Sequence, residues 1–150
     1  PPEAMHRTAC LSADRRYRWT LRRRWGPGAY AAFIGLNPST ADETQDDPTI
    51  RRCIGFARSW GFDALCMVNL FAYRATDPAD MKRAADPVGD LNDATLLDVA
   101  RVAGVVIAAW GAHGTWLKRD EHVRFLLGRK LHCLRLTPWL SPSWGRVRSF

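Results

Sequence analysis

The chain has 150 residues, 47% of them hydrophobic, and a formal net charge of +7. This length supports one well-buried core and is too short for two ordinary domains, so we expect a single domain over residues 1–150. No apolar run approaches the ~20 residues that a membrane span needs, and no signal-peptide core opens the chain, which predicts a cytoplasmic protein without a membrane partner.

The cysteines and histidines show no metal-binding or disulfide pattern. The four cysteines are scattered without a C-x-x-C pair, which argues against both a zinc site and a disulfide framework. The four histidines also lack a ligand spacing such as H-E-x-x-H. We therefore expect no metal and no cofactor, and most of the cysteines are predicted to be small core residues.

The first predicted elements form a basic hairpin. Residues 1–14 are expected to be loosely ordered. From residue 16 to residue 24 apolar and polar residues alternate, which predicts a half-buried strand with Leu21 inside and Arg22 outside. Gly26-Pro27-Gly28 then turns the chain into a second strand over residues 31–36, so the basic strand is expected at an edge of the sheet.

Apolar runs and helical patterns alternate along the rest of the chain. Asp47-Pro48 is typical of a helix start, and the apolar spacing that follows predicts a helix over residues 48–60. Further strands are predicted at residues 64–70, 105–109 and 131–136, and further helices at residues 78–84, 92–103 and 115–127. Residues 138–150 form a tail rich in proline and tryptophan.

This alternation predicts an α/β fold. We expect a three-layer α/β/α arrangement with a short, mostly parallel central sheet, to which the N-terminal hairpin adds an antiparallel edge. Ligands of open α/β sheets bind beyond the carboxyl ends of the strands. The loops after residues 36, 70, 109 and 136 would line that end, and we predict the binding pocket there.

Asn37 ends the second apolar strand and is held by a following proline. A side-chain amide can orient a water molecule without deprotonating it, which suffices where the leaving group departs early, as at an oxocarbenium-like sugar carbon. Asn37 is therefore a candidate catalytic residue, with Gly35, Pro38 and Ser39 as candidate substrate-binding neighbours. The alternative is that Asn37-Pro38-Ser39 only caps a turn.

Four carboxylates follow Asn37 closely: Asp42, Glu43, Asp46 and Asp47. Asp42 is the candidate general base, and the run could instead bind a divalent cation or a cationic group. The alternative is that Asp47 caps the helix and the other carboxylates are solvated.

The loops after the next two strands add candidate substrate-binding residues. Asn69 carries donor and acceptor atoms suited to the edge of a nucleobase. A base could stack on Phe71 or Tyr73 while Arg74 binds a phosphate. His113 could donate a hydrogen bond at the same edge, and each of these residues is equally suited to stabilising its own loop.

Arginines crowd residues 15–24, which is typical of a surface that binds nucleic acid or a nucleotide, although a solvated sheet edge gives the same pattern. The candidate nucleic-acid-binding residues are Arg22, Arg23 and Arg24 in this segment and Ser143, Trp144 and Arg146 in the tail. The expected partner is a nucleic acid or a nucleotide.

Four blocks, FIGLNPSTADETQDDPTIRRC, VNLFAYRATDP, DPVGDLND and AWGAHG, resemble a bacterial and phage family of unknown function that is recognisable by its LNPSTAD block. The resemblance runs from about Tyr17 to Leu136.

More distantly, Gly35-Leu36-Asn37-Pro38 is similar to the Gly-Ile-Asn-Pro motif of mismatch-specific uracil/thymine-DNA glycosylases, in which the Asn positions the attacking water. Further similar positions follow in the same order: Pro48 and Arg51, Gly61-Phe62, Asn69 to Arg74, Gly111, and Ser141-Pro142-Ser143. The resemblance implies the uracil-DNA glycosylase-like fold and hydrolysis of an N-glycosidic bond of a nucleobase in DNA or in a nucleotide.

Two positions depart from the glycosylase pattern. Gln45-Asp46-Asp47 stands where those enzymes carry an aromatic platform for the flipped base, and Ser141-Pro142-Ser143-Trp144 replaces their His-Pro or Asn-Pro motif. Two other functions therefore stay open. One is a non-catalytic module that binds nucleic acid or a nucleotide, and the other is a Mg²⁺-dependent nucleotide phosphohydrolase that uses the acidic run.

Overall fold

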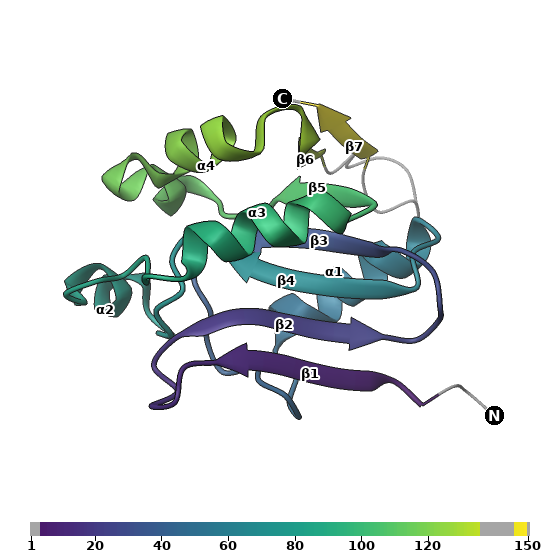
Figure 1. Ribbon diagram of the computed structural model, residues 1–150, viewed down its shortest axis with the longest axis horizontal. Coiled ribbons are helices and arrows are strands. Elements are labelled where there is room, and N and C mark those ends of the chain that lie inside the picture. Colours follow the sequence, from purple (N-terminus) through teal and green to yellow (C-terminus); the bar gives the residue numbers. More distant parts are fainter. Residues whose placement is uncertain (1–3, 136–145, 150) are drawn as a thin grey trace.

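The computed structural model describes residues 4–135 and 146–149, and within them a seven-stranded mixed sheet is covered by helices on both faces (Figure 1). The strands, in chain order, are β1 (His6–Leu11), β2 (Arg18–Arg24), β3 (Tyr30–Gly35), β4 (Ala64–Asn69), β5 (Val105–Ala108), β6 (Leu131–Arg135) and β7 (Arg146–Ser149). The helices are α1 (Pro48–Ser59), α2 (Pro78–Arg83), α3 (Asn92–Val102) and α4 (Arg119–Leu127), with 3₁₀ turns η1 (Ala112–Lys118) and η2 (Gly128–Lys130).

The strand order is β1-β2-β4-β3-β5-β6-β7. The pairings β3 with β4, β3 with β5 and β5 with β6 are parallel, whereas β1 with β2, β2 with β4 and β6 with β7 are antiparallel. The predicted α/β class is confirmed, but the sheet is mixed rather than mostly parallel, because antiparallel strands extend the parallel centre on both sides.

The hairpin predicted between residues 16–24 and residues 31–36, which correspond to β2 and β3, is wrong. β4 lies between β2 and β3, and β2 pairs with β1 and β4 instead. Every residue of β3 is buried, so this strand is most stable between two neighbours in the middle of the sheet. β1 is the edge strand on this side of the sheet, and it lies within residues 1–14, which were expected to be loosely ordered.

A register shift in the β1–β2 pair changes which side chains of β2 are buried. Cys10 pairs with Thr20 and Leu11 with Arg18, which leaves Trp19 outside the regular pairing. A bulge of this kind interrupts the alternation of faces along a strand. Consequently Arg18 is buried, although the regular alternation placed it on the outer face, whereas Arg23 is buried because it lies on the same face as Leu21.

Two apolar clusters hold the layers together. One packs α3 and α4 on the face formed by residues such as Ile34 and Val68, and the other packs α1 on the face formed by residues such as Phe33 and Met67. Within residues 4–135 and 146–149, no helix has the length and apolarity that a membrane crossing requires.

Candidate functional site

The site lies where the parallel strands β3, β4 and β5 end. β3 leads into α1 on one face of the sheet, whereas β5 leads through η1 into α4 on the other face (Figure 1). Because the chain leaves these adjacent strands in opposite directions, a crevice opens between their carboxyl ends, and ligands of open α/β sheets bind in such a crevice.

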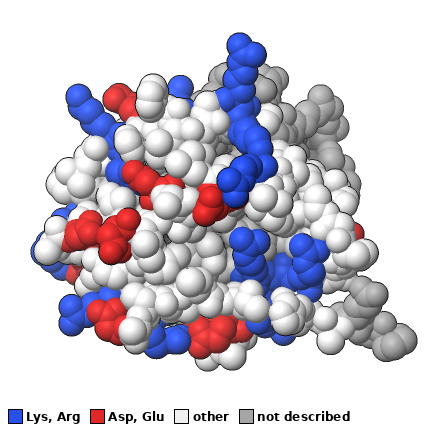
Figure 2. Space-filling view, viewed as in Figure 1, with Lys and Arg blue, Asp and Glu red and all other residues white. Residues whose placement is uncertain are grey.

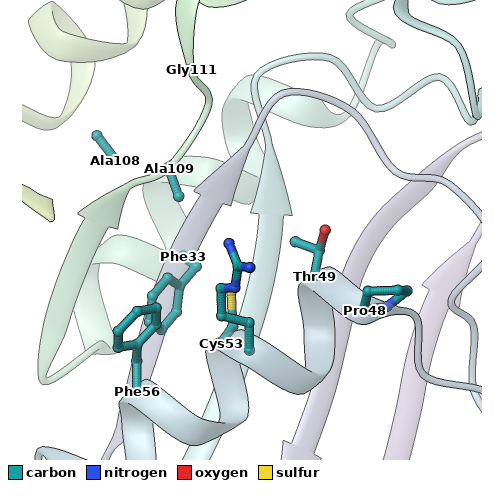
Figure 3. A pocket seen from close by; sticks show the side chains of 9 residues that line it. Phe33, Pro48, Thr49, Cys53, Phe56, Ala108, Ala109 and Gly111 are labelled. Carbon is teal, nitrogen blue, oxygen red and sulfur yellow. The ribbon is translucent and has the colours of Figure 1, made fainter. Parts of the chain in front are cut away.

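A pocket of about 540 Å³ occupies this crevice (Figure 3). Its lining residues come from β3, the first two turns of α1 and the end of β5, and they are Phe33, Pro48, Thr49, Arg52, Cys53, Phe56, Ala108, Ala109 and Gly111. Figure 3 shows the Phe33 and Phe56 rings side by side at one end of the pocket and Thr49 on the first turn of α1. The pocket is therefore apolar on its floor, with polar groups from α1.

At the carboxyl ends of β3 and β4, a glycine and an asparagine lie opposite each other. Gly35 pairs with Asn69, and a Cβ at Gly35 would lie 2.9 Å from Asn69 Nδ2 and 2.7 Å from Met67 Cε. Gly35 thus leaves room for the Asn69 side chain. Asn69 is only 1% exposed, so it lies beneath the surface of the site.

Buried Arg18 contacts Asn69 from β2. Its guanidinium donates to Asn69 Oδ1 at 3.3 Å and to the carbonyl of Ala41 at 3.0 Å. Burial lowers the pKa of Arg18 to about 10, so the guanidinium still carries its charge at neutral pH. The pair fixes the Asn69 carbonyl oxygen as an acceptor and attaches the loop after β3 to the sheet.

The Asn37 side chain is anchored through its nitrogen. Asn37 Nδ2 donates to the carbonyl of Ala75 at 2.8 Å and to the carbonyl of Pro38 at 3.1 Å. These two bonds use both amide hydrogens and determine which way the amide points. Within the described part of the chain, no bond involves Asn37 Oδ1, which leaves this oxygen as an acceptor at the carboxyl edge.

The loops after β3 and β4 lie side by side, as the sequence predicted. The backbone amide of Ala75 donates to the carbonyl of Pro38 at 2.9 Å, and Arg74 Nε donates to the carbonyl of Ser39 at 3.2 Å. Ser39 Oγ also donates to Thr76 Oγ1 at 3.3 Å. Arg74 is therefore engaged with backbone carbonyls, and its second bond goes to Arg15.

Three of the other predicted substrate-binding residues have different surroundings. Phe71 is 0% exposed in the core, so its ring cannot stack on a base. Tyr73 packs edge-on against Tyr17, with 5.6 Å between the ring centroids. His113 lies on η1, and its Nδ1 is 3.2 Å from Lys82 Nζ of α2. Neither Tyr73 nor His113 forms a hydrogen bond with Asn37, whose side chain bonds to Pro38 and Ala75.

Asp42 stabilises the loop rather than standing free as a base. Its Oδ1 accepts from the backbone amides of Thr44 and Gln45, both at 2.9 Å. These bonds, together with the charge of Arg15, lower the pKa of Asp42. A carboxylate with a lowered pKa is a weaker base, which argues against the catalytic role predicted for Asp42.

The other acidic residues also have structural partners. Asp47 accepts from the backbone amide of Ile50 and caps α1, Asp46 pairs with Arg23 at 2.7 Å, and Glu43 pairs with Arg15 at 3.1 Å. Across the described ranges no group of three or more histidine, cysteine or carboxylate residues could hold a metal ion. The capping role of Asp47 was predicted, and the ion pairs of Asp46 and Glu43 were not.

The basic segment does not line the site. Arg23 is 0% exposed and donates inside the protein, which leaves its guanidinium no surface for the nucleic-acid contact predicted for it. Arg22 and Arg24 lie opposite Cys66 and Ala64, toward the amino end of β4 and away from Asn69. Figure 2 shows basic side chains gathered near the end where β2 finishes. Ser143 and Trp144 are outside the described residues, and Arg146 is described only as part of β7.

Two buried residues that the sequence did not single out hold the exit of β4. Asn92 Nδ2 donates to the carbonyls of Asn69 and Leu70, both at 2.9 Å, and Arg119 donates twice to the carbonyl of Leu70. Arg119 also pairs with Asp93 at 2.9 Å. No local pattern marks these residues, because their partners are 22 or more positions away in the chain.

Comparison with known proteins identifies a family and no activity. No curated protein and no solved structure matches the chain. Residues 18–143 match a family described as "Protein of unknown function (DUF1643)". The match covers well over half of the chain and includes Asn37, Asn69 and every residue that lines the pocket. The chain therefore belongs to this family of unknown function.

Proposed function

We propose that the protein is a glycosylase-like hydrolase that cleaves the N-glycosidic bond of a nucleobase in DNA or in a nucleotide. The observation that carries the proposal is the Asn37 amide, whose nitrogen is held by the carbonyls of Ala75 and Pro38. The oxygen that remains can accept a hydrogen bond from water and hold the water in one orientation. The resemblance to the Gly-Ile-Asn-Pro motif supports the same role for Asn37.

In the proposed reaction, the oxygen of a water molecule held by Asn37 attacks the sugar carbon C1′. The bond between C1′ and the base nitrogen breaks, and its electron pair leaves with the base, which takes up a proton. The water loses a proton to the solvent. Because the sugar carbon becomes cationic before attack is complete, orientation of the water suffices and a strong base is not required.

The surroundings of the acidic run favour this reaction over metal-dependent phosphate hydrolysis. Asp42, Asp46 and Asp47 each accept from a different structural partner, so their oxygens do not converge on one point. The carboxylates that a Mg²⁺ phosphohydrolase would need are thus engaged in holding the loop and starting α1.

The test is release of free base from strands and nucleotides that contain uracil, hypoxanthine or mismatched bases, measured with and without Mg²⁺. We expect activity without Mg²⁺ and a loss of about 100-fold or more in Asn37→Ala, because the water is no longer oriented. Thr76→Ala is the matched control, since it removes another bond between the same two loops and keeps the amide. The control is expected to retain most of the activity.

Two results would count against the hydrolase. Asn37→Ala that releases base at the wild-type rate would remove Asn37 from the mechanism. Absence of base release across the panel, together with salt-dependent binding of the same molecules, would identify a binding module instead.

A further inference from the structure

The pocket at the ends of β3 and β5 is lined by one guanidinium that forms no hydrogen bond or ion pair within the part of the chain that the structure describes. Arg52 lines the pocket from α1 and is exposed. Within residues 4–135 and 146–149, no hydrogen bond or ion pair engages it. Its neighbour Arg51, by contrast, donates to the carbonyl of Asp46 at 3.3 Å.

Several basic residues around the same edge, unlike Arg52, have a partner within the protein. Arg15 pairs with Glu43, Arg83 pairs with Asp80, and Lys82 contacts His113. A protein that follows a nucleic-acid backbone needs several cations free to contact successive phosphates. Among the described residues that line the pocket, Arg52 is the one cation, and no hydrogen bond or ion pair engages it.

The rest of the pocket suits a flat apolar group. Phe33 and Phe56 line its floor with the small part of each residue that is exposed, 1% and 6%, and both stack on Trp60, with ring centroids 5.8 and 5.5 Å away. The stacked rings fix the floor in place. The opposite wall contains Gly111, whose φ of +69° and open surroundings leave space where a side chain would lie.

Helical spacing places the polar groups together on one side of the pocket. Thr49 and Arg52 are three residues apart on α1, so they are neighbours on the same face of the helix. A guanidinium binds phosphate through two parallel hydrogen bonds, and a nearby hydroxyl can add a third. The pocket volume of about 540 Å³ is in the range of pockets for small molecules, ~300–1,000 Å³.

We propose that this pocket binds a free nucleoside monophosphate, with the phosphate on Arg52 and Thr49 and the base over the apolar floor that Phe33 and Phe56 line. The inference rests on the proposed function and narrows its substrate from DNA or nucleotide to the mononucleotide. The arginines of β2 agree with it. Arg23 is buried, and Arg22 and Arg24 lie away from the pocket, so none of the three is placed to bind further phosphates of a nucleic acid at this site.

Isothermal titration of the full chain tests the proposal. The probes are the 5′-monophosphates of deoxyuridine, thymidine, deoxycytidine, deoxyadenosine and deoxyguanosine, the matching nucleosides, inorganic phosphate and a short single-stranded oligonucleotide. We expect at least one monophosphate to bind about tenfold or more tightly than its nucleoside, since hydrogen bonds to a charged group are the strong ones. Arg52→Gln should abolish this difference, and Arg51→Gln, next to it but outside the pocket, should preserve it.

Several results would overturn the proposal. They are equal binding of monophosphates and nucleosides, an unchanged preference in Arg52→Gln, inorganic phosphate binding as tightly as a monophosphate, and an oligonucleotide binding more tightly than a monophosphate through Arg52. Binding and base release measured on the wild-type protein separate the two proposals. Mononucleotide binding without base release in the wild type would refute the hydrolase and support the pocket, whereas base release from DNA without mononucleotide binding would do the reverse.

Discussion

Replacement of Arg23 by methionine is expected to destabilise the protein severely. The Arg23 guanidinium donates to Asp46 Oδ1 at 2.7 Å and to the carbonyls of Thr8, Asp42 and Gln45 at 3.3, 2.5 and 3.1 Å. Methionine keeps the unbranched stem but leaves a carboxylate and these carbonyls without their donor. Breaking one side of a buried ion pair costs about 3–5 kcal/mol, a large part of the ~5–15 kcal/mol that stabilises a typical domain.

Urea denaturation followed by far-UV circular dichroism measures this free energy. For a chain of this size the loss corresponds to a fall in Tm of roughly 10 °C. Arg22→Met is the matched control, because Arg22 is exposed and lies over the Tyr30 ring at 5.2 Å, a contact that contributes about 1 kcal/mol or less. Asp46→Asn combined with Arg23→Met should cost less than the sum of the single changes, since the unpaired carboxylate is removed. A cost below about 1 kcal/mol for Arg23→Met would refute the structural role of Arg23.

Three further predictions concern the site and its frame. Gly35→Ala should reduce activity more than stability, because the new Cβ would displace the ends of the Met67 and Asn69 side chains; base release and urea denaturation on one preparation would check this, and unchanged activity would contradict it. Asp42→Ala should lower stability at neutral pH. The folded-state pKa of Asp42 is lowered from its ordinary value of 3.8, so the difference in unfolding free energy between the wild type and the variant should persist above that pH and shrink as the pH falls through the lowered pKa. A difference that does not change with pH in urea titrations would be the contrary result. Burial raises the pKa of Cys53 to about 12 and of Cys66 to about 11, so both thiols should resist alkylation in the folded protein while exposed Cys10 reacts, as mass spectrometry of iodoacetamide-treated protein would show.

The parallel centre of the sheet was predictable because its signals are local. β3, β4 and β5 lie within the predicted strands over residues 31–36, 64–70 and 105–109 to within one residue at each end. Their continuous apolar runs reflect burial on both faces. α1 was predicted for a similar reason, since Asp47 caps it and Pro48 begins it.

The order of the outer strands and the first residue of α4 were not predictable, because they depend on long-range pairing and on backbone conformation. The order of β2, β4 and β3 is decided by which strand needs two neighbours, and a turn sequence such as Gly26-Pro27-Gly28 does not encode that. The helix predicted over residues 115–127 begins only at Arg119, because Leu117 and Lys118 adopt positive φ values of 54° and 53°. The sequence carries no glycine at these positions to mark the break.

The edge of the sheet at which the candidate site lies was predictable, but none of the predicted catalytic or substrate-binding residues lines the pocket there. Asn37 follows β3 and Asn69 ends the neighbouring β4, and this alone places them at one edge. Whether a polar group is free to bind a ligand depends on partners far away in the chain, as when Arg18 bonds to Asn69 and Arg23 pairs with Asp46. For this reason Arg52 was not singled out, since only the structure distinguishes it from the engaged arginines.

Most charged residues near the site hold one loop, residues 36–47, in place. Residues 36–47 connect β3 to α1, and they are held by Arg18 at Ala41, by Arg23 at Asp42, and by Ala75 at Pro38. A loop fixed at several points cannot move its Asn37 amide without breaking bonds elsewhere, which is the rigidity that orientation of a water molecule requires. The same loop ends at the Asp47 cap and so also sets the start of α1, which carries Arg52. In the proposed enzyme, one braced segment therefore determines the distance between the group that orients water and the group that binds phosphate.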